Sequence, residues 1–261
     1  MTGKIVSAGG IRLWYVERGD GLPVVMVHGN TGSSRWFARV MDLPGCRTIA
    51  LDLPNFGRSA PLPGKLSIDA YADKVAEFIS AMKIHGPVLV AHSLGGAVAI
   101  SLAVRNPALL RGLVLVDSAA PSGLVTPEDR YPVIESMRVD CDFLAAALSG
   151  VVPTLKDKEF FQVLVDDAML MAGPAWVGNA RALAAFDYND KCRAFEHPVL
   201  VLWGRKDVIV TEAMARETAR AFPKAKLVVL EEVGHSVVVE APSSFTKLLL
   251  EFISVLAKEG V

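Results

Sequence analysis

Residues 88–96 read Val-Leu-Val-Ala-His-Ser-Leu-Gly-Gly, and this stretch decides the fold of the chain. Its first four residues have the composition of a buried strand, whereas the small, apolar stretch Leu94–Val104 is typical of a helix. Ser93 therefore lies on a sharp strand-to-helix turn, which projects its hydroxyl from the sheet beside the N–H groups of the helix N-terminus. Such a turn needs small residues two positions before and after the serine, and Ala91 and Gly95 meet that need. The stretch predicts a nucleophilic serine between a buried parallel strand and a helix.

Apolar runs of the same kind recur along the chain, each bounded by turn residues. They are too short for helices and rich in Val, Leu and Ile, which is typical of buried parallel strands. The first two differ because they flank Gly9-Gly10 and predict a hairpin. The expected strands are Lys4–Ala8, Ile11–Glu17, Val24–Val27, Thr48–Leu51, Val88–Ala91, Leu113–Val116, Val199–Leu202 and Leu227–Leu230. Helical patterns lie between them, over Ser67–Met82, Leu94–Val104, Glu212–Phe222 and Pro242–Leu256. The alternation predicts an α/β fold with an eight-stranded, mostly parallel sheet and helices on both faces.

The alternation stops between the sixth and seventh expected strands, where Ser118–Pro198 contains no convincing strand. The segment has helix-like patterns and many large apolar residues, and a structureless loop of that length is uncommon in a compact domain. We therefore expect an inserted helical cap over residues 121–196. The core is expected to comprise residues 1–120 and 197–261.

Composition limits the function classes. The chain has 261 residues and a formal net charge of −1, with scattered Lys and Arg, so we expect no nucleic-acid or membrane partner. Its three cysteines, Cys46, Cys141 and Cys192, form no CxxC pair or zinc-ligand pattern, so we expect reduced thiols and no metal. The N-terminus lacks a signal-peptide pattern, and no apolar run approaches the ~20 residues that span a bilayer. These features predict a cytoplasmic protein.

Two further residues complete a catalytic pattern with Ser93. His235 lies directly after the last expected strand, where a general base for the serine is required. An acid follows the seventh strand at Asp207, and another ends the sixth at Asp117. With Asp207 the chain order is Ser, Asp, His, which this strand-turn-helix architecture demands. The pattern predicts Ser93 as nucleophile, His235 as base and Asp207 as the orienting acid.

The loop after the third expected strand reads Val27-His28-Gly29-Asn30. Gly29 lets the backbone turn so that the N–H of Asn30 faces the site beside the N–H of Leu94. Two such donors stabilise the negative charge that develops on a carbonyl oxygen during acyl transfer. We therefore predict an oxyanion hole formed by Asn30 and Leu94. His28 is expected to hold that loop by hydrogen bonds, and His92 to pack or to line the pocket.

These motifs occur in succession over almost the whole chain: His28-Gly29, Leu51–Ser59, the turn at Ser93, Gly204-x-x-Asp207 and Gly234-His235. Together they resemble the α/β-hydrolase superfamily, and in particular its esterase, lactonase and carbon–carbon hydrolase branches. The likeness favours Asp207 over Asp117, because the Gly204–Asp207 turn is similar to the usual acid-bearing loop. Ala91 and Asn55 stand where the usual pattern has glycine.

The resemblance also implies a reaction type. Epoxide hydrolases and haloalkane dehalogenases of this superfamily use aspartate at the turn, whereas Ser93 implies attack on a carbonyl and an acyl-enzyme. We therefore predict a hydrolase of a small to medium, largely apolar carboxylic ester or lactone, with no metal or organic cofactor. Its pocket is expected between the cap and the C-terminal edge of the sheet, lined by bulky residues such as Trp176 or Phe143.

Two alternatives stay open. One is a hydrolase of a carbon–carbon bond in a ketone or dienoic acid, for which Arg35, Arg39 or Arg181 could supply the cationic group. The other is a ligand-sensing protein that keeps a slow triad and uses the cap as a signalling surface. The rate of turnover distinguishes the two, because a sensor should process its ligand very slowly.

Overall fold

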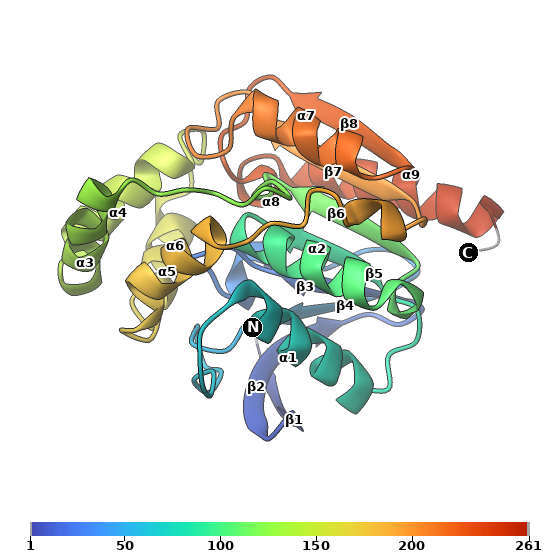
Figure 1. The fold of residues 1–261 in the computed structure, drawn as a ribbon, viewed down its shortest axis with the longest axis horizontal. Coiled ribbons are helices and arrows are strands. Elements are labelled where there is room, and N and C mark those ends of the chain that lie inside the picture. Colours follow the sequence, from blue (N-terminus) through green and yellow to red (C-terminus); the bar gives the residue numbers. More distant parts are fainter. Residues whose placement is uncertain (1, 260–261) are drawn as a thin grey trace.

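The computed structural model describes residues 2–259, and an eight-stranded sheet runs through its centre (Figure 1). The strand order is β1-β2-β4-β3-β5-β6-β7-β8. β1 and β2 form the expected hairpin, β2 is also antiparallel to β4, and the other neighbouring strands are parallel. The strands are β1 Lys4–Ala8, β2 Ile11–Arg18, β3 Leu22–Val27, β4 Cys46–Leu51, β5 Val88–His92, β6 Gly112–Val116, β7 Val199–Gly204 and β8 Ala225–Leu230. The predicted eight-stranded, mostly parallel sheet is confirmed.

Helices cover both faces of this sheet, as predicted (Figure 1). One face packs against α1 Ile68–Ala81 and α2 Leu94–Arg105, with α7 Glu212–Ala221 beside them. The other packs against η1 Ser34–Phe37, α8 Val237–Glu240 and α9 Pro242–Glu259. The side chains of β3, β5, β6 and β7 alternate between these two apolar layers, so the strands are buried on both faces. Three further short 3-10 helices are η2 Pro107–Leu109, which follows α2, and η3 Glu128–Arg130 and η4 Cys192–Ala194, which both lie between β6 and β7.

The start of α1 shows how local sequence fixes an element. The Ser67 hydroxyl accepts the Ala70 N–H at 3.1 Å, which satisfies one of the free donors of the first turn. Tyr71, Val75 and Phe78 then fall on one buried face of the helix.

Four helices lie between β6 and β7, where the sequence predicted an insertion. They are α3 Tyr131–Val139, α4 Cys141–Val151, α5 Lys158–Ala168 and α6 Ala175–Ala184, and we call them the cap helices. Asp140 and Asp157 cap the N-termini of α4 and α5 by accepting the N–H groups of Phe143 and Phe160. The helical character of this segment is therefore observed, whereas the domain boundaries at residues 121 and 196 stay a prediction.

Within residues 2–259, no helix is both long enough and apolar enough to cross a lipid bilayer.

Candidate active site

Ser93 occupies a strained turn between β5 and α2. Its φ and ψ angles are 54° and −119°, in a region that residues other than glycine rarely adopt. Three backbone hydrogen bonds hold it there: its N–H donates to the Val116 carbonyl at 3.0 Å, and its carbonyl accepts the N–H groups of Gly96 at 2.8 Å and Ala119 at 3.2 Å. A Cβ on Gly95 would lie 2.4 Å from the carbonyl oxygen of His28, so only glycine fits two residues after Ser93.

The three residues predicted as a triad lie in one hydrogen-bonded series. Nε2 of His235 is 2.9 Å from Oγ of Ser93, and Nδ1 of His235 is 2.8 Å from Oδ2 of Asp207. The other carboxylate oxygen of Asp207 accepts the N–H groups of Ile209 and Val210 at 2.7 and 2.9 Å. Because the carboxylate can only accept, the imidazole donates from Nδ1, which leaves Nε2 free to accept the serine proton.

The charges around His235 favour its protonated form. Burial alone lowers its pKa, but the hydrogen bond to Asp207 and the charges of Asp207, Asp117 and Glu240 outweigh burial. The pKa of His235 is therefore raised above its ordinary value of 6.5. This environment stabilises a protonated imidazole at His235.

Asp117, the second acid considered from the sequence, does not contact His235 through a hydrogen bond. Its carboxylate accepts the Gly204 N–H at 2.9 Å and the Val237 N–H at 3.0 Å. It thus joins the end of β7, which leads to Asp207, to the segment that follows His235. Burial raises the pKa of Asp117 to about 7. Both partners of Asp117 belong to the core.

The loop after β3 is held as expected. His28 donates from Nδ1 to the Gly29 carbonyl at 2.8 Å, and its Nε2 accepts the Leu53 N–H at 3.0 Å. Burial lowers the pKa of His28, so its imidazole stays neutral. Gly29 lies so close to the turn that a Cβ there would be 2.7 Å from the Cβ of Ser93. Asn30, the next residue, lines the same cavity as Ser93.

His92 both packs and lines the cavity, as the sequence suggested. Its Nε2 donates to the His235 carbonyl at 2.7 Å, and its ring stacks on Trp36 with the centroids 5.4 Å apart. Burial, aided by the charge of His235, lowers the pKa of His92 to about 3. The His92 ring is therefore neutral near pH 7, so it lines the site and does not act as an acid there.

A cavity of about 390 Å³ opens at Ser93 between the strand ends and the cap helices. Its apolar walls come from both regions, and among the described residues no Lys, Arg, Asp or Glu lines it. Its lining includes Met137 and Leu144 of the cap helices and Val208 and Ile209 beside Asp207.

The expectation that Trp176 or Phe143 lines this cavity is wrong. Trp176 is buried in the hydrophobic core, where its indole N–H donates to the Met171 carbonyl at 3.3 Å. Phe143 points outward from α4 and is 40% exposed. The size of a side chain did not predict whether it lines the cavity at Ser93, because the packing of each helix determines which side chains face inward.

The arginines considered for an acidic substrate interact elsewhere. Arg35 pairs with Asp167 at 3.2 Å, and Arg39 pairs with Asp157 and lies over the Phe160 ring. Arg181 lies over the ring of Tyr131, 5.4 Å from its centroid. None of the three is among the residues that line the described cavity at Ser93.

Asn179 of α6 is a site residue that the sequence reasoning missed. Its Nδ2 donates to Oδ1 of Asn30 at 2.8 Å. A lone asparagine within a helix carries no motif, and its contact with Asn30 crosses 149 residues of sequence.

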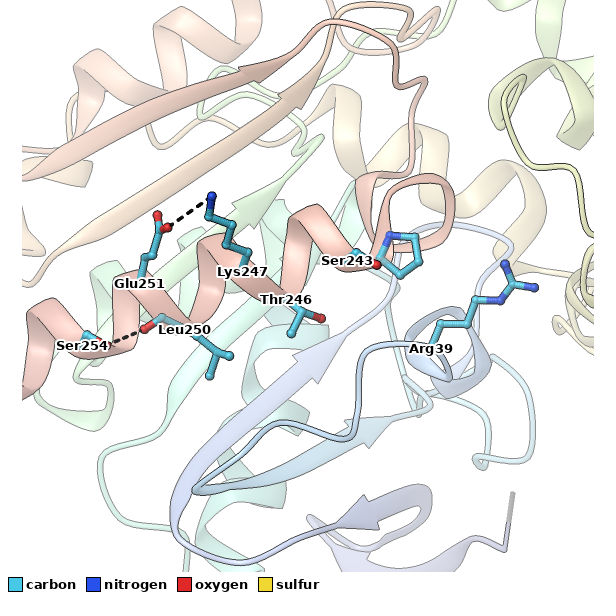
Figure 2. Close-up of a pocket in the computed structure, with 8 residues that line it drawn as sticks. Arg39, Ser243, Thr246, Lys247, Leu250, Glu251 and Ser254 are labelled. Atoms are coloured by element: carbon cyan, nitrogen blue, oxygen red, sulfur yellow. Dashed lines mark hydrogen bonds and ion pairs between the residues drawn. The ribbon is translucent and has the colours of Figure 1, made fainter.

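A second hollow lies apart from this chemistry. A groove of about 670 Å³ is lined by residues of α9 and by Arg39. Figure 2 shows these side chains along α9. Its Lys247 and Glu251 pair with each other at 4.0 Å, and it shares no lining residue with the cavity at Ser93. Within residues 2–259, no group of three or more His, Cys, Asp or Glu side chains is arranged to hold a metal ion.

Comparisons with known proteins agree with this architecture. Residues 24–247 match the model of the alpha/beta hydrolase family. The 2-hydroxymuconate semialdehyde hydrolase of Pseudomonas sp. (strain CF600) is 30% identical, with 97% of this chain and 94% of that protein covered. A thermophilic esterase from Thermogutta terrifontis superposes with a TM-score of 0.80 at 27% identity, covering 98% and 99% of the two chains. An N-acyl homoserine lactone degrading enzyme superposes with a TM-score of 0.82 at 25% identity, covering 95% of this chain and 100% of that chain. The chain therefore belongs to the alpha/beta hydrolase family.

Proposed function

We propose that this chain hydrolyses a carboxylic ester or lactone with a largely apolar acyl group, and that Ser93, His235 and Asp207 are its catalytic triad. One observation carries the proposal: the hydrogen-bonded series from Asp207 through His235 to Ser93 ends in an apolar cavity. A serine hydroxyl is a weak nucleophile until an adjacent base accepts its proton, and the 2.9 Å contact with Nε2 supplies that base.

The reaction follows from the positions of these groups. His235 removes the proton of Ser93 as Oγ attacks the carbonyl carbon. The oxyanion of the resulting tetrahedral intermediate accepts hydrogen bonds from the N–H groups of Asn30 and Leu94. The leaving alkoxide then takes the proton from His235, and an acyl group stays on Ser93. Water, deprotonated by His235, cleaves this acyl-enzyme and restores the serine. Asp207 keeps its charge throughout and holds the imidazole tautomer.

The cavity supports an uncharged substrate of small to medium size. Its volume of about 390 Å³ and its aliphatic walls suit a short or medium acyl chain. Similarity to a thermophilic esterase and to an enzyme that degrades N-acyl homoserine lactones supports the same substrate class.

Carbon–carbon bond hydrolysis is the second proposal, because the 30% identical relative is a 2-hydroxymuconate semialdehyde hydrolase. A substrate of that kind carries a carboxylate, which needs a cationic or hydrogen-bonding partner when it leaves water. The described cavity lining contains no Lys or Arg, so the ester or lactone is the better match.

Covalent labelling tests the mechanism. A phosphonate fluoride should add to Ser93, detected by intact-mass and peptide mass spectrometry. Ser93→Ala should lose the label and at least ~10³-fold in kcat toward an activated ester. Ser122→Ala, at an exposed serine, is the matched control and should behave as wild type. Labelling elsewhere, together with normal activity of Ser93→Ala, would refute the triad.

A substrate panel separates the reaction types. It compares p-nitrophenyl esters of increasing chain length, homoserine lactones and a hydroxylated dienoic acid. We expect the highest kcat/KM among the esters or lactones. Preference for the dienoic acid would favour carbon–carbon cleavage, and binding with very slow turnover of every compound would favour the ligand sensor.

A further inference from the structure

A buried series of hydrogen bonds connects the cap helices to the loop after β3. Nδ2 of Asn55 donates to the hydroxyl of Tyr71 at 2.9 Å, and that hydroxyl donates to Oδ1 of Asn179 at 2.9 Å. Nδ2 of Asn179 then donates to Oδ1 of Asn30 at 2.8 Å. Tyr71 and Asn179 are both fully buried. The four side chains come from the loop after β4, from α1, from α6 and from the loop after β3.

The direction of each hydrogen bond in this series is determined. The Tyr71 hydroxyl has one proton, so accepting from Asn55 directs that proton to Asn179. Oδ1 of Asn179 is thereby fixed toward Tyr71, and its amide nitrogen must face Asn30. In a buried site the reverse orientation would leave donors facing donors, which is costly.

Asn55 is itself anchored to the segment between α5 and α6 and to its own loop. Its φ is 73°, a left-handed conformation that asparagine tolerates better than most residues. Its carbonyl accepts the Ala172 N–H at 2.8 Å, and its Oδ1 accepts the Leu62 N–H at 2.9 Å. Its Nδ2 is therefore held in place to donate to Tyr71.

Local hydrogen bonds hold the backbone around Asn30: His28 donates to the Gly29 carbonyl, and the Thr31 hydroxyl donates to the Asn30 carbonyl at 2.6 Å. The side chain of Asn30 is held from outside this loop, by Asn179. An oxyanion hole works only if its N–H groups are held where the charge develops, without reorganising during the reaction. The bond from Asn179 fixes the side chain of the residue whose N–H is proposed to donate.

We propose that Asn179, oriented by Tyr71 and Asn55, is a positioning residue that holds Asn30 in the geometry of an oxyanion hole. The contact of α6 with the core then influences the chemical step as well as the shape of the cavity. This inference rests on the proposed function, because it assigns Asn179 a role in the same acyl transfer.

Tyr71→Phe is the primary test, because it removes the hydroxyl and keeps the ring. Tyr188→Phe is the matched control: Tyr188 is also buried, and its hydroxyl donates to Asp69 at 2.9 Å, outside the series. The measurements are kcat and KM for a p-nitrophenyl ester, and Ki for an alkylboronic acid. The boronic acid adds to the serine as a tetrahedral adduct, so its affinity reports on the oxyanion hole.

Tyr71→Phe should lower kcat by about 5- to 30-fold and raise Ki by a similar factor, with KM within about twofold of wild type. Tyr188→Phe should leave kcat and Ki within about twofold, although it loses a comparable hydrogen bond. Unchanged kcat and Ki in Tyr71→Phe, or a rise in KM alone, would overturn the positioning role.

Asn55→Gly provides a second variant if Tyr71→Phe does not fold. Glycine accepts the positive φ of residue 55, and it removes the first donor of the series together with the oxygen that accepts the Leu62 N–H. It should shift kcat and Ki in the same direction by a smaller factor. Phosphonate labelling of Ser93 is measured in parallel. If the wild type is labelled and active and the variants behave like it, this inference alone is overturned. If the wild type is neither labelled nor active, the triad is overturned as well.

Discussion

The loops at the C-terminal ends of the strands and the cap helices both line the cavity at Ser93, but different forces hold their residues. In the strand-end loops, Asp207 accepts two backbone N–H groups besides the imidazole, and Asp117 accepts two more. In the cap helices, Met137 and Leu144 reach the cavity through apolar packing. Hydrogen bonds fix atoms to within tenths of an ångström, whereas aliphatic packing tolerates exchange of similar volumes. We therefore expect the loops to determine the chemistry and the cap helices to determine which substrate fits.

The largest expected effect within the strand-end loops comes from Asp207→Asn. An amide there no longer enforces the tautomer with its proton on Nδ1, nor does it stabilise the imidazolium. We expect kcat to fall by about 10⁴-fold while the thermal unfolding curve stays cooperative. Steady-state kinetics with an activated ester and circular dichroism measure the two quantities.

Asp117→Asn is the control for this prediction. It should lose far less activity, because Asp117 bonds to Gly204 and Val237 and not to the imidazole. A greater loss in Asp117→Asn than in Asp207→Asn would assign the acid to the end of β6.

A pair of glycine substitutions tests the two regions directly. In Gly95→Ala the new Cβ would lie 2.4 Å from the His28 carbonyl oxygen and 2.7 Å from that of Val27, and backbone atoms cannot move aside cheaply. We expect at least ~10²-fold loss of kcat, since small displacements of reacting groups have effects of that size. Gly173→Ala, between α5 and α6, meets no atom closer than 4.0 Å and should keep kcat and Tm near wild type. Equal effects of the two would contradict the distinction between rigid loops and tolerant cap.

The same difference explains what the sequence could predict. Ser93, Asp207 and His235 were predictable because each lies in the turn or loop that follows a parallel strand, and the C-terminal ends of parallel strands meet at one edge of a sheet. The glycines at 29 and 95 added to this because each belongs to a turn motif, although their close contacts join the loop after β3 to the start of α2. The inner strands were equally predictable, since burial on both faces leaves near-continuous apolar runs, whereas β1 and β2 were predicted from the glycine turn between them.

The cap helices were predictable as helices but not in the residues they turn inward. Trp176 and Phe143 are as bulky and apolar as any wall residue, yet one lies in the core and the other faces outward. Which face of a short helix is covered depends on its neighbours in three dimensions, and periodicity over 10 or 11 residues does not specify it. Asn179 was missed for the same reason, because its partners are Tyr71 and Asn30, far away in sequence.

Met137→Ala and Phe143→Ala test the inward and outward faces of the cap helices. Met137 lines the cavity, so shortening it should shift the preference between acetate and octanoate esters by about 1–3 kcal/mol, a factor of roughly 10 to 200. Phe143 is 40% exposed and lies outside the lining, so Phe143→Ala should leave this preference unchanged. The ratio of kcat/KM for the two esters is the measurement. A shift only in Phe143→Ala would place the acyl group outside the cavity.

The smallest expected effect is on the pH dependence of kcat/KM, which the charges of the strand-end loops influence. His235 accepts the serine proton only when it is neutral, so kcat/KM should fall as the pH drops through its pKa. That pKa is raised above 6.5: burial lowers it, but the bond to Asp207 and the charges of Asp207, Asp117 and Glu240 outweigh burial. The acid limb of the profile should therefore lie above pH 6.5.

Asp117→Asn should move this limb to lower pH, because it removes one of the negative charges that favour the imidazolium. The shift should be less than about one pH unit, since Asp207 and Glu240 retain their charges and the pKa of Asp117 itself is about 7. Near neutral pH Asp117 is thus only partly ionised, so its field on His235 is incomplete in the wild type. Asp190→Asn, at an exposed carboxylate, is the control and should leave the limb unmoved. A limb that stays in place or moves to higher pH in Asp117→Asn would mean that Asp117 acts on the site through its bonds to Gly204 and Val237 and not through its charge.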